Sequence, residues 1–239
     1  MYNVENYVAE TLDSALNQTL QNLEIIVVDD GSTDRSGEIV NEYASRDSRI
    51  KVLTQPNAGL GAARNAGIAE AKGRYLTFLD SDDIIPPSAY EDMVKTLNVT
   101  GSDFAVGAVR RVTHGKFSAP QWCRVTHDKD RLGITIDDFS LAMQDIIACN
   151  RMFRTEFWRE RIGNFPEGVA YEDHAPMVAA YVRATKFDML RRVTYYWRIR
   201  EDQKSIGQQK HSIQNLKDRK HAKEQALRVI SAEASSGVR

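Results

Sequence analysis

The stretch Glu24-Ile-Ile-Val-Val-Asp-Asp-Gly-Ser-Thr-Asp34 decides the fold of this 239-residue chain. Leu23–Val28 is short, rich in β-branched residues and almost entirely apolar, which predicts a buried strand of a parallel sheet. Asp29-Asp30-Gly31 follows, and the glycine allows a tight turn there. Ser32 or Thr33 can then cap a helix that runs to about residue 44. A strand that leads through an acidic turn into a helix indicates an α/β fold.

Helical and strand patterns alternate on both sides of this unit. The expected elements of the first hundred residues are a helix from about Asn3, strands over residues 50–53 and 74–79, and helices over 61–71 and from Pro86-Pro87 onward. Such alternation predicts a parallel sheet with right-handed crossovers, and ligands of these sheets bind outside the carboxyl ends of the strands.

The pattern changes beyond residue 100. We expect an antiparallel pair of strands over 102–112 and 116–125, helices over 137–147, 155–162 and 172–184, a strand over 187–196, and a basic amphipathic helix over 212–230. The chain therefore divides into residues 1–100, residues 101–208 and a C-terminal helix and tail, 209–239.

Composition narrows the class of protein. With 42% hydrophobic and 27% charged residues, the chain is typical of a globular protein. It has no run of eighteen apolar residues and no secretory signal, which predicts neither a transmembrane helix nor export. Cys123 and Cys149 lack the spacing of a zinc site, so we expect buried free thiols in a cytoplasmic protein.

The charges are unevenly distributed. Residues 1–100 hold 16 Asp and Glu against 8 Lys and Arg, whereas residues 101–239 hold 17 against 24. This asymmetry suits a first half that holds a cation with a phosphate and a second half that meets an anionic acceptor or lipid headgroups. Solvated faces without a function explain it as well.

Asp80-Ser81-Asp82-Asp83 places three carboxylates within four residues after a predicted strand. Oxygen ligands favour Mg²⁺ or Mn²⁺, which proteins usually share with phosphate oxygens. Capping of the following helix is the alternative. Because Asp29-Asp30 also follows a strand, both acidic clusters are expected at one edge of the sheet, which favours the metal.

The glycine-rich turn of residues 57–61 resembles a dinucleotide-binding loop only superficially. The third glycine of that fingerprint would fall at Arg64, which argues against a nicotinamide-dependent oxidoreductase. Gly59 and Gly61 instead allow close approach of the backbone, while Arg64 either reaches a phosphate or orders the carboxylates.

These motifs resemble those of family 2 glycosyltransferases with the nucleotide-sugar-binding GT-A fold. The matching stretches lie in family order: residues 2–7, 24–34, 57–67 and 75–83. The resemblance implies an α/β fold with a mostly parallel central sheet flanked by helices, a smaller mixed acceptor region and a C-terminal helix. It makes residues 1–100 the nucleotide-sugar half and 101–208 the acceptor half.

The resemblance also implies a set of donor-site residues. Those expected to bind the nucleotide sugar are Tyr2, Glu5, Asp29, Asp30, Gly31, Arg64, Asp80, Ser81 and Arg198. Asp30, alone or together with Asp29, would recognise the base, and Arg64 would lie near the diphosphate. Asp82, with Asp80, would hold Mn²⁺ or Mg²⁺.

In the second half, residues 150–158, 165–168 and 171–174 resemble the acceptor region of bacterial cell-surface polysaccharide enzymes. By this resemblance Asp173 is the general base and Glu172 orients or assists it. Favourable interaction with a helix N-terminus is an alternative reason for both acids. Arg198 could stabilise the leaving diphosphate and Trp197 could stack on a sugar, or both could belong to an ordinary strand.

The implied function is inverting, metal-dependent transfer of a sugar from a nucleotide-diphosphate sugar to a glycan or polyol-phosphate acceptor of the teichoic-acid type. Nucleic acid is not an expected partner. The basic C-terminal helix suits contact with the inner face of the plasma membrane, although a solvated helix is the alternative. The family's first strand would lie before Tyr2, and its apparent absence favours a second hypothesis, a catalytically inactive binding or scaffold module.

Overall fold

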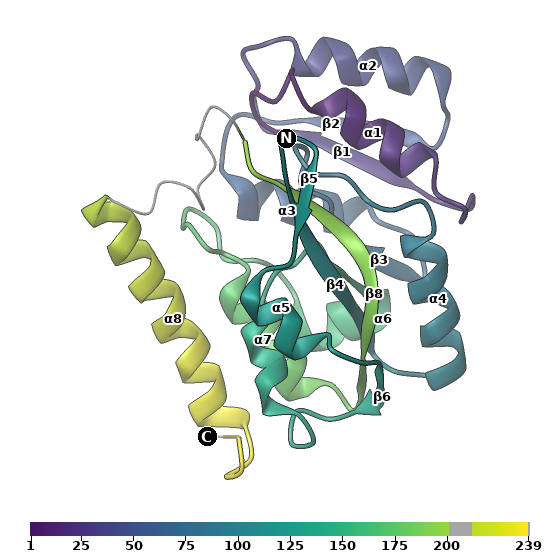
Figure 1. Cartoon of the computed structure of the whole chain (residues 1–239). Coiled ribbons are helices and arrows are strands. Elements are labelled where there is room, and N and C mark those ends of the chain that lie inside the picture. The colour runs from purple at the N-terminus through teal and green to yellow at the C-terminus, as the bar shows by residue number, and fades with distance from the viewer. Residues whose placement is uncertain (201–211, 239) are drawn as a thin grey trace.

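The computed structural model describes residues 1–200 and 212–238 (Figure 1). In the first half the elements are α1 Val8–Leu16, β1 Ile25–Asp29, α2 Ser36–Arg46, β2 Ile50–Thr54, α3 Leu60–Glu70, β3 Tyr75–Thr77 and α4 Ala89–Thr100. The second half contains β4 Phe104–Thr113, β5 Lys116–Ser118, α5 Gln121–Thr126, β6 Arg131–Ile134, a 3₁₀ turn Ser140–Gln144, β7 Arg151–Arg154, α6 Thr155–Phe157, a π-helical turn Trp158–Ile162, α7 His174–Arg183, β8 Phe187–Arg198 and α8 Ile213–Glu233.

The N-terminal part is built on the parallel pair β1 and β2, in register from Ile25 opposite Ile50 to Asp29 opposite Thr54. Helices α1 and α2 pack on this pair through a small apolar cluster that includes Val8, Leu12 and Val40. Helix α3 also packs against β1, and Figure 1 shows it on the opposite side from α1 and α2. The strand predicted over residues 23–28 and its parallel neighbour are thus confirmed.

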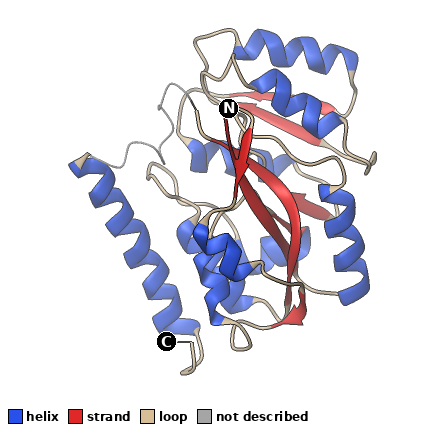
Figure 2. Ribbon diagram, in the orientation of Figure 1, coloured by secondary structure: helices blue, strands red, loops and turns tan. Residues whose placement is uncertain are grey.

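A six-stranded sheet forms the centre of the molecule, in the order β3-β7-β4-β8-β6 with β5 beside β4 (Figure 2). Its longest ladder, between β4 and β8, is parallel like the β1–β2 ladder, whereas its shorter ladders are antiparallel. In the described residues β3 pairs with β7 rather than with β1. The sheet buries Phe104, Phe153 and Phe187 in the largest apolar core.

Some local predictions were wrong. Residues 116–125 form a strand only to Ser118 and then the helix α5, because Pro120 has a φ of −55° and its ring suits a helix start. Of residues 137–147 only a short 3₁₀ turn is helical, and β6 and β7 were not predicted as strands. Ser32 and Thr33 do not cap α2. They bond to Asn3 instead, and the Ser36 N–H at the helix start donates to Asp34.

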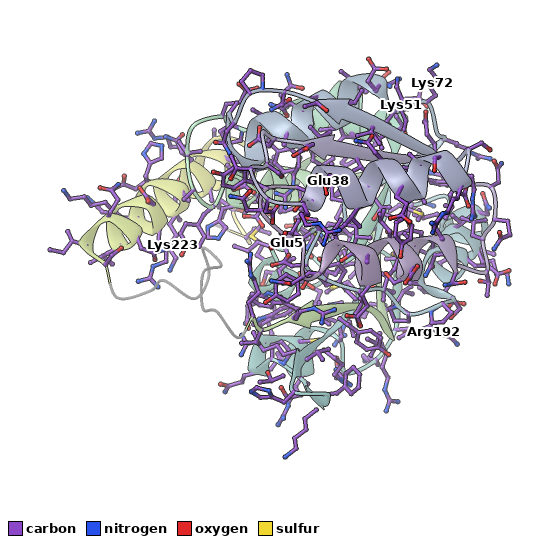
Figure 3. All side chains as sticks on the ribbon, turned by 90° about the horizontal axis from the view of Figure 1, so that it is seen from above. Glu5, Glu38, Lys51, Lys72, Arg192 and Lys223 are labelled. Atoms are coloured by element: carbon purple, nitrogen blue, oxygen red, sulfur yellow. The ribbon has the colours of Figure 1, made fainter. Side chains whose placement is uncertain are left out.

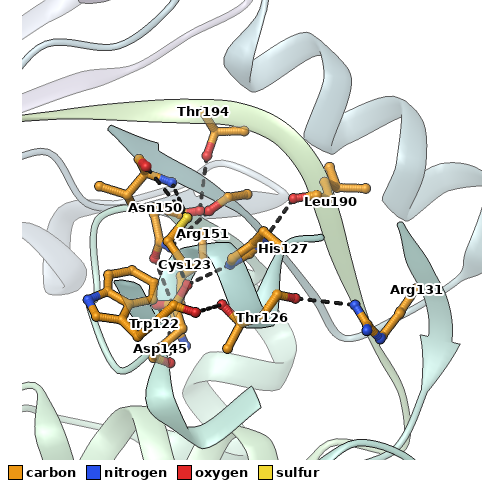
Figure 4. A network of polar contacts seen from close by, with 12 residues as sticks. Trp122, Cys123, Thr126, His127, Arg131, Asp145, Asn150, Arg151, Leu190 and Thr194 are labelled. Carbon is orange, nitrogen blue, oxygen red and sulfur yellow. Dashed lines mark hydrogen bonds and ion pairs between the residues drawn. The ribbon is translucent and has the colours of Figure 1, made fainter. Parts of the chain in front are cut away.

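A buried polar network fixes α5 and β7 against β8 (Figure 4). His127 lies between the Leu190 carbonyl and the Asp145 carboxylate, at 2.8 Å from each. Arg151 and Asn150 donate to the two oxygens of the same carboxylate at 2.8 and 2.7 Å. Since Asp145, Asn150 and Arg151 are all fully buried, this network rigidifies the second half of the chain.

Candidate active site

Arg64, on the first turns of α3, joins the two halves of the chain. Its Nη2 donates to Oδ1 of Asp80 at 2.9 Å, and its Nη1 forms an ion pair with Glu172, 108 residues further on. The guanidinium also lies over the rings of Phe78 and Phe165, at 5.9 and 5.1 Å from their centroids. Only 8% of the Arg64 side chain is exposed. Of the two roles predicted for Arg64, the structure thus shows the ordering of carboxylates.

Glu172 and Asp173 lie directly before α7, and Glu172 is the one that pairs with this arginine. Burial raises the pKa of both carboxyl groups above their ordinary values, Arg64 opposes the rise, and the other acids of the site add to it. Glu172 is almost completely buried, whereas Asp173 is half-buried. A raised pKa on a partly buried carboxyl group is common at functional sites, and the role of Asp173 as a general base stays a prediction.

The acidic loop after β3 is clamped by two distant elements. The hydroxyl of Thr11, on α1, shares its one hydrogen between the backbone oxygens of Asp83 and Ser81, at 2.7 and 3.0 Å. From β8, the Tyr195 hydroxyl and the Arg198 N–H each donate to the Asp83 carboxylate at 2.6 Å. Asp83 is therefore buried and fully engaged, and burial raises its pKa.

Asp80 and Asp82 are the two acids of the loop that keep exposed surface, 35% and 20% of their side chains. Asp82 Oδ2 lies 3.7 Å from Arg200. Burial and the charge of Asp80 raise the pKa of Asp82 to about 6. The two carboxylates repel each other, and each is paired with an arginine, Asp80 with Arg64 and Asp82 with Arg200.

The pair of Asp80 and Asp82 fits a small divalent cation that also binds the phosphates of a substrate. The described part of the chain contains no group of three or more acidic, His or Cys side chains able to hold a metal alone. Mg²⁺ and Mn²⁺ need no such cage, because they commonly bind one or two carboxylates together with the phosphates of a substrate. Asp82 and Asp80 would supply those two, although Arg64 already shares Asp80.

The second acidic turn holds its own loop. Asp30 accepts hydrogen bonds from the Gln55 side chain and from the N–H groups of Ala58 and Gly59, at 2.7, 3.0 and 2.9 Å. Asp29 accepts from the Ser32 N–H at 3.0 Å. Asp30 thus joins the turn after β1 to the glycine-rich turn before α3, whereas the Asp29 side chain holds its own turn, and the role of these acids in base recognition stays a prediction.

Gly31 is required by this geometry. Its φ is +77°, and a Cβ at this position would stand 2.8 Å from the Asn57 nitrogen. A side chain would therefore push the two turns apart.

The remaining predicted donor residues surround these turns. Glu5, on the surface in Figure 3, accepts from the Arg35 N–H at 3.0 Å, and Tyr2 is 48% exposed. Arg198 binds the Asp82 backbone oxygen at 2.7 Å and Glu10 at 2.6 Å. Ser81 contributes its backbone oxygen to the Thr11 bond. No contact in the structure tests their binding of a nucleotide sugar.

Residues that sequence reasoning did not assign to the site also belong to it. Tyr195 and Thr11 clamp the acidic loop, and Cys149 lies with its Sγ 3.7 Å from Arg64. Both cysteines are buried free thiols, as predicted. A threonine in an amphipathic helix and a tyrosine in a strand carry no local signal of such a role.

The fold and this site define a family. Residues 1–194 match the model of Glycosyl transferase family 2, and the chain belongs to that family. Its similarity to solved structures shows the GT-A fold. S. aureus TarS 1–349, in complex with UDP-GlcNAc, superposes on this chain with a TM-score of 0.83 at 24% sequence identity. The match covers 99% of this chain and 66% of that one.

This chain matches parts of longer curated proteins. The glycosyltransferase GlyA of Streptococcus pneumoniae serotype 4 is 50% identical over 107 residues, which are 45% of this chain and 15% of the relative. The poly(ribitol-phosphate) beta-glucosyltransferase of Bacillus spizizenii is 31% identical over 207 residues, 84% of this chain and 32% of the relative. The chain thus spans less than a third of the length of either protein.

Proposed function

We propose that this chain transfers a sugar from a nucleotide-diphosphate sugar to a hydroxyl of a cell-surface polysaccharide or teichoic-acid-like acceptor, with inversion at the anomeric carbon. The observation that carries the proposal is the position of Arg64, which ties the acidic loop after β3 to the Glu172-Asp173 pair before α7. Two acidic motifs that lie some ninety residues apart in the sequence therefore face a common site.

In the proposed reaction Asp173 accepts the proton of the acceptor hydroxyl. The acceptor oxygen forms a bond to the anomeric carbon as the bond from that carbon to the diphosphate oxygen breaks, and the nucleoside diphosphate leaves with the electron pair. Glu172, neutralised by Arg64, fixes the loop from which Asp173 acts. A cation on Asp82 and Asp80 would supply charge neutralisation for the leaving diphosphate. One displacement inverts the configuration.

Support for the substrates comes from the relatives. TarS is described in complexes with UDP-GlcNAc and UDP, which makes UDP-sugars the first donors to test. A relative over most of this chain is named as a glucosyltransferase of poly(ribitol-phosphate), an anionic polyol phosphate. The excess of Lys and Arg in residues 101–239 suits an acceptor of this charge.

The location of the reaction belongs to the same proposal. Among the described helices none is long and apolar enough to cross a membrane. We place the reaction in the cytoplasm, with peripheral contact at the inner face of the plasma membrane through the cations of α8, Lys217, Lys220, Lys223 and Arg228.

The test is a panel of nucleotide sugars with Mn²⁺ or Mg²⁺, in which release of nucleoside diphosphate and thermal stabilisation are both measured. Metal-dependent release that increases with a polyol-phosphate acceptor supports the proposal. Stabilisation without any release, under the same conditions, favours the second hypothesis of a binding or scaffold module.

A further inference from the structure

Tyr171, directly before Glu172 and Asp173, has an unusual backbone. Its φ is +60°, in the left-handed region that residues other than glycine, asparagine and aspartate rarely adopt. Such a conformation persists only where the surrounding structure holds it. Contacts from outside its own turn must therefore hold Tyr171 in this conformation.

The main contact comes from α8. The Tyr171 hydroxyl donates to Oδ1 of Asn215 at 3.0 Å, across 44 residues. Asn215 is buried, with 6% of its surface exposed. It lies in the first turn of α8, where its N–H donates to the Ser212 side chain at 3.0 Å. The acceptor of the Tyr171 hydroxyl is thus itself fixed by a helix cap.

A second contact of Tyr171 is with His174. The Tyr171 ring packs against the ring of His174, with centroids 5.5 Å apart. Burial, and then the positive charge of Lys223 on α8, lowers the pKa of His174. Tyr171, directly before the Glu172-Asp173 pair, therefore contacts α8 and also packs on His174, directly after that pair.

Helix α8 is itself anchored to the acceptor half. It packs along α7, as Figure 1 shows. Near its C-terminal end Arg183 of α7 makes two hydrogen bonds of 2.6 Å to the Glu233 carboxylate. Beyond the helix, Ser235 donates to Asp137. Asn215 consequently belongs to a docked element with a defined position.

We infer that Tyr171 and Asn215 are positioning residues, and that their hydrogen bond aims Asp173 at the acceptor hydroxyl. Glu172 has its own anchor in Arg64, whereas the direction of Asp173 depends on the backbone that Tyr171 holds. Small displacements of a reacting group cost large factors in rate. This inference rests on the proposed function, in which Asp173 is the base.

The test compares four single variants with the parent chain. Tyr171→Phe removes the donor and Asn215→Leu removes the acceptor, whereas Asn215→Asp keeps an acceptor oxygen in place. Arg183→Gln breaks the other tie between α7 and α8, far from Tyr171, and is the matched control. For each, we measure UDP-sugar turnover, stabilisation by UDP, melting temperature, and deuterium exchange of the backbone over residues 168–175.

Tyr171→Phe and Asn215→Leu are expected to lower turnover by about 10- to 100-fold, with UDP stabilisation unchanged and faster exchange over 168–175. Asn215→Asp should stay within about twofold of the parent because it keeps the acceptor oxygen, and Arg183→Gln because it lies away from the Tyr171 contact. The double variant Tyr171→Phe/Asn215→Leu should be no worse than either single one, because both break the same bond.

Turnover that survives in both Tyr171→Phe and Asn215→Leu overturns the inference, as does an equal loss in Arg183→Gln. If the parent releases no nucleoside diphosphate, the proposed function fails, and exchange over 168–175 then decides the positioning role alone. In that case, parent-like exchange in Tyr171→Phe overturns the inference.

Discussion

The hydroxyl of Tyr195 donates a hydrogen bond of 2.6 Å to Oδ2 of Asp83, which joins the end of β8 to the loop after β3. The Asp80 N–H also points at this hydroxyl, at 3.4 Å. One buried phenol therefore holds the loop at two points, and the acids that remain exposed are Asp80 and Asp82.

Tyr195→Phe should lower the free energy of unfolding by about 1–3 kcal/mol, because the buried Asp83 carboxylate loses a donor. Loosening of the loop should also weaken metal-dependent binding of UDP. Chemical denaturation and titration with UDP and Mn²⁺ measure the two effects. Tyr196→Phe, the adjacent tyrosine of β8 whose ring packs on Phe117, is the control. Equal behaviour of the two variants would argue against the clamp.

Asp82→Asn should abolish metal-dependent binding of the nucleoside diphosphate, since one charge and one ligand oxygen are lost from a site for a hard cation. The loss of transition-state stabilisation should be on the order of several kcal/mol. Turnover with and without Mn²⁺ is the measurement, with Glu38→Gln on the surface of α2 as control. Full metal-dependent turnover in Asp82→Asn would remove Asp82 from the cation site.

Asp173→Asn should lower turnover by about 10²- to 10⁴-fold, the usual contribution of a general base. Affinity for the nucleotide sugar should hardly change, because in the proposed reaction this residue faces the acceptor. Steady-state kinetics and calorimetric titration with UDP separate these effects. A collapse of UDP affinity with turnover retained would instead show a structural residue.

The same pair of acids predicts a dependence of stability on pH. Burial raises the pKa of Glu172 and Asp173 above their ordinary values of 4.5 and 3.8, so the folded chain holds protons that the unfolded chain releases. Their contribution to stability is therefore complete below about pH 4 and is lost as the pH rises toward neutrality.

This contribution can be isolated by denaturation between pH 4.5 and pH 7.5. Asp173→Asn, which mimics the protonated carboxyl group, should lose less stability than the parent over this interval and should melt at a higher temperature at pH 7.5. An identical pH dependence in parent and variant would mean that Asp173 does not carry the raised pKa.

Local sequence determined the elements whose signal lies within a few residues. Leu23–Val28 is an apolar, β-branched run, and it forms β1 beside its parallel partner β2. The acidic turns after β1 and β3 were also predictable, because short-range rules for strand ends and glycine turns apply there. Arg64, Asp80 and Glu172 were each predicted site residues, but the meeting of Arg64 with Glu172 was not predicted and comes from the structure.

Only the tertiary structure decided which partners these residues take. Asp83 is anchored by Tyr195 and Thr11, and Asp30 holds the glycine-rich turn, through contacts that span many residues and leave no periodic pattern. Strand β7 and helix α5 were not predicted, because the conformation of such short elements depends more on the surrounding sheet and core than on intrinsic propensity. Sequence thus determined the chemical groups and their local turns, and long-range packing determined their burial and their partners.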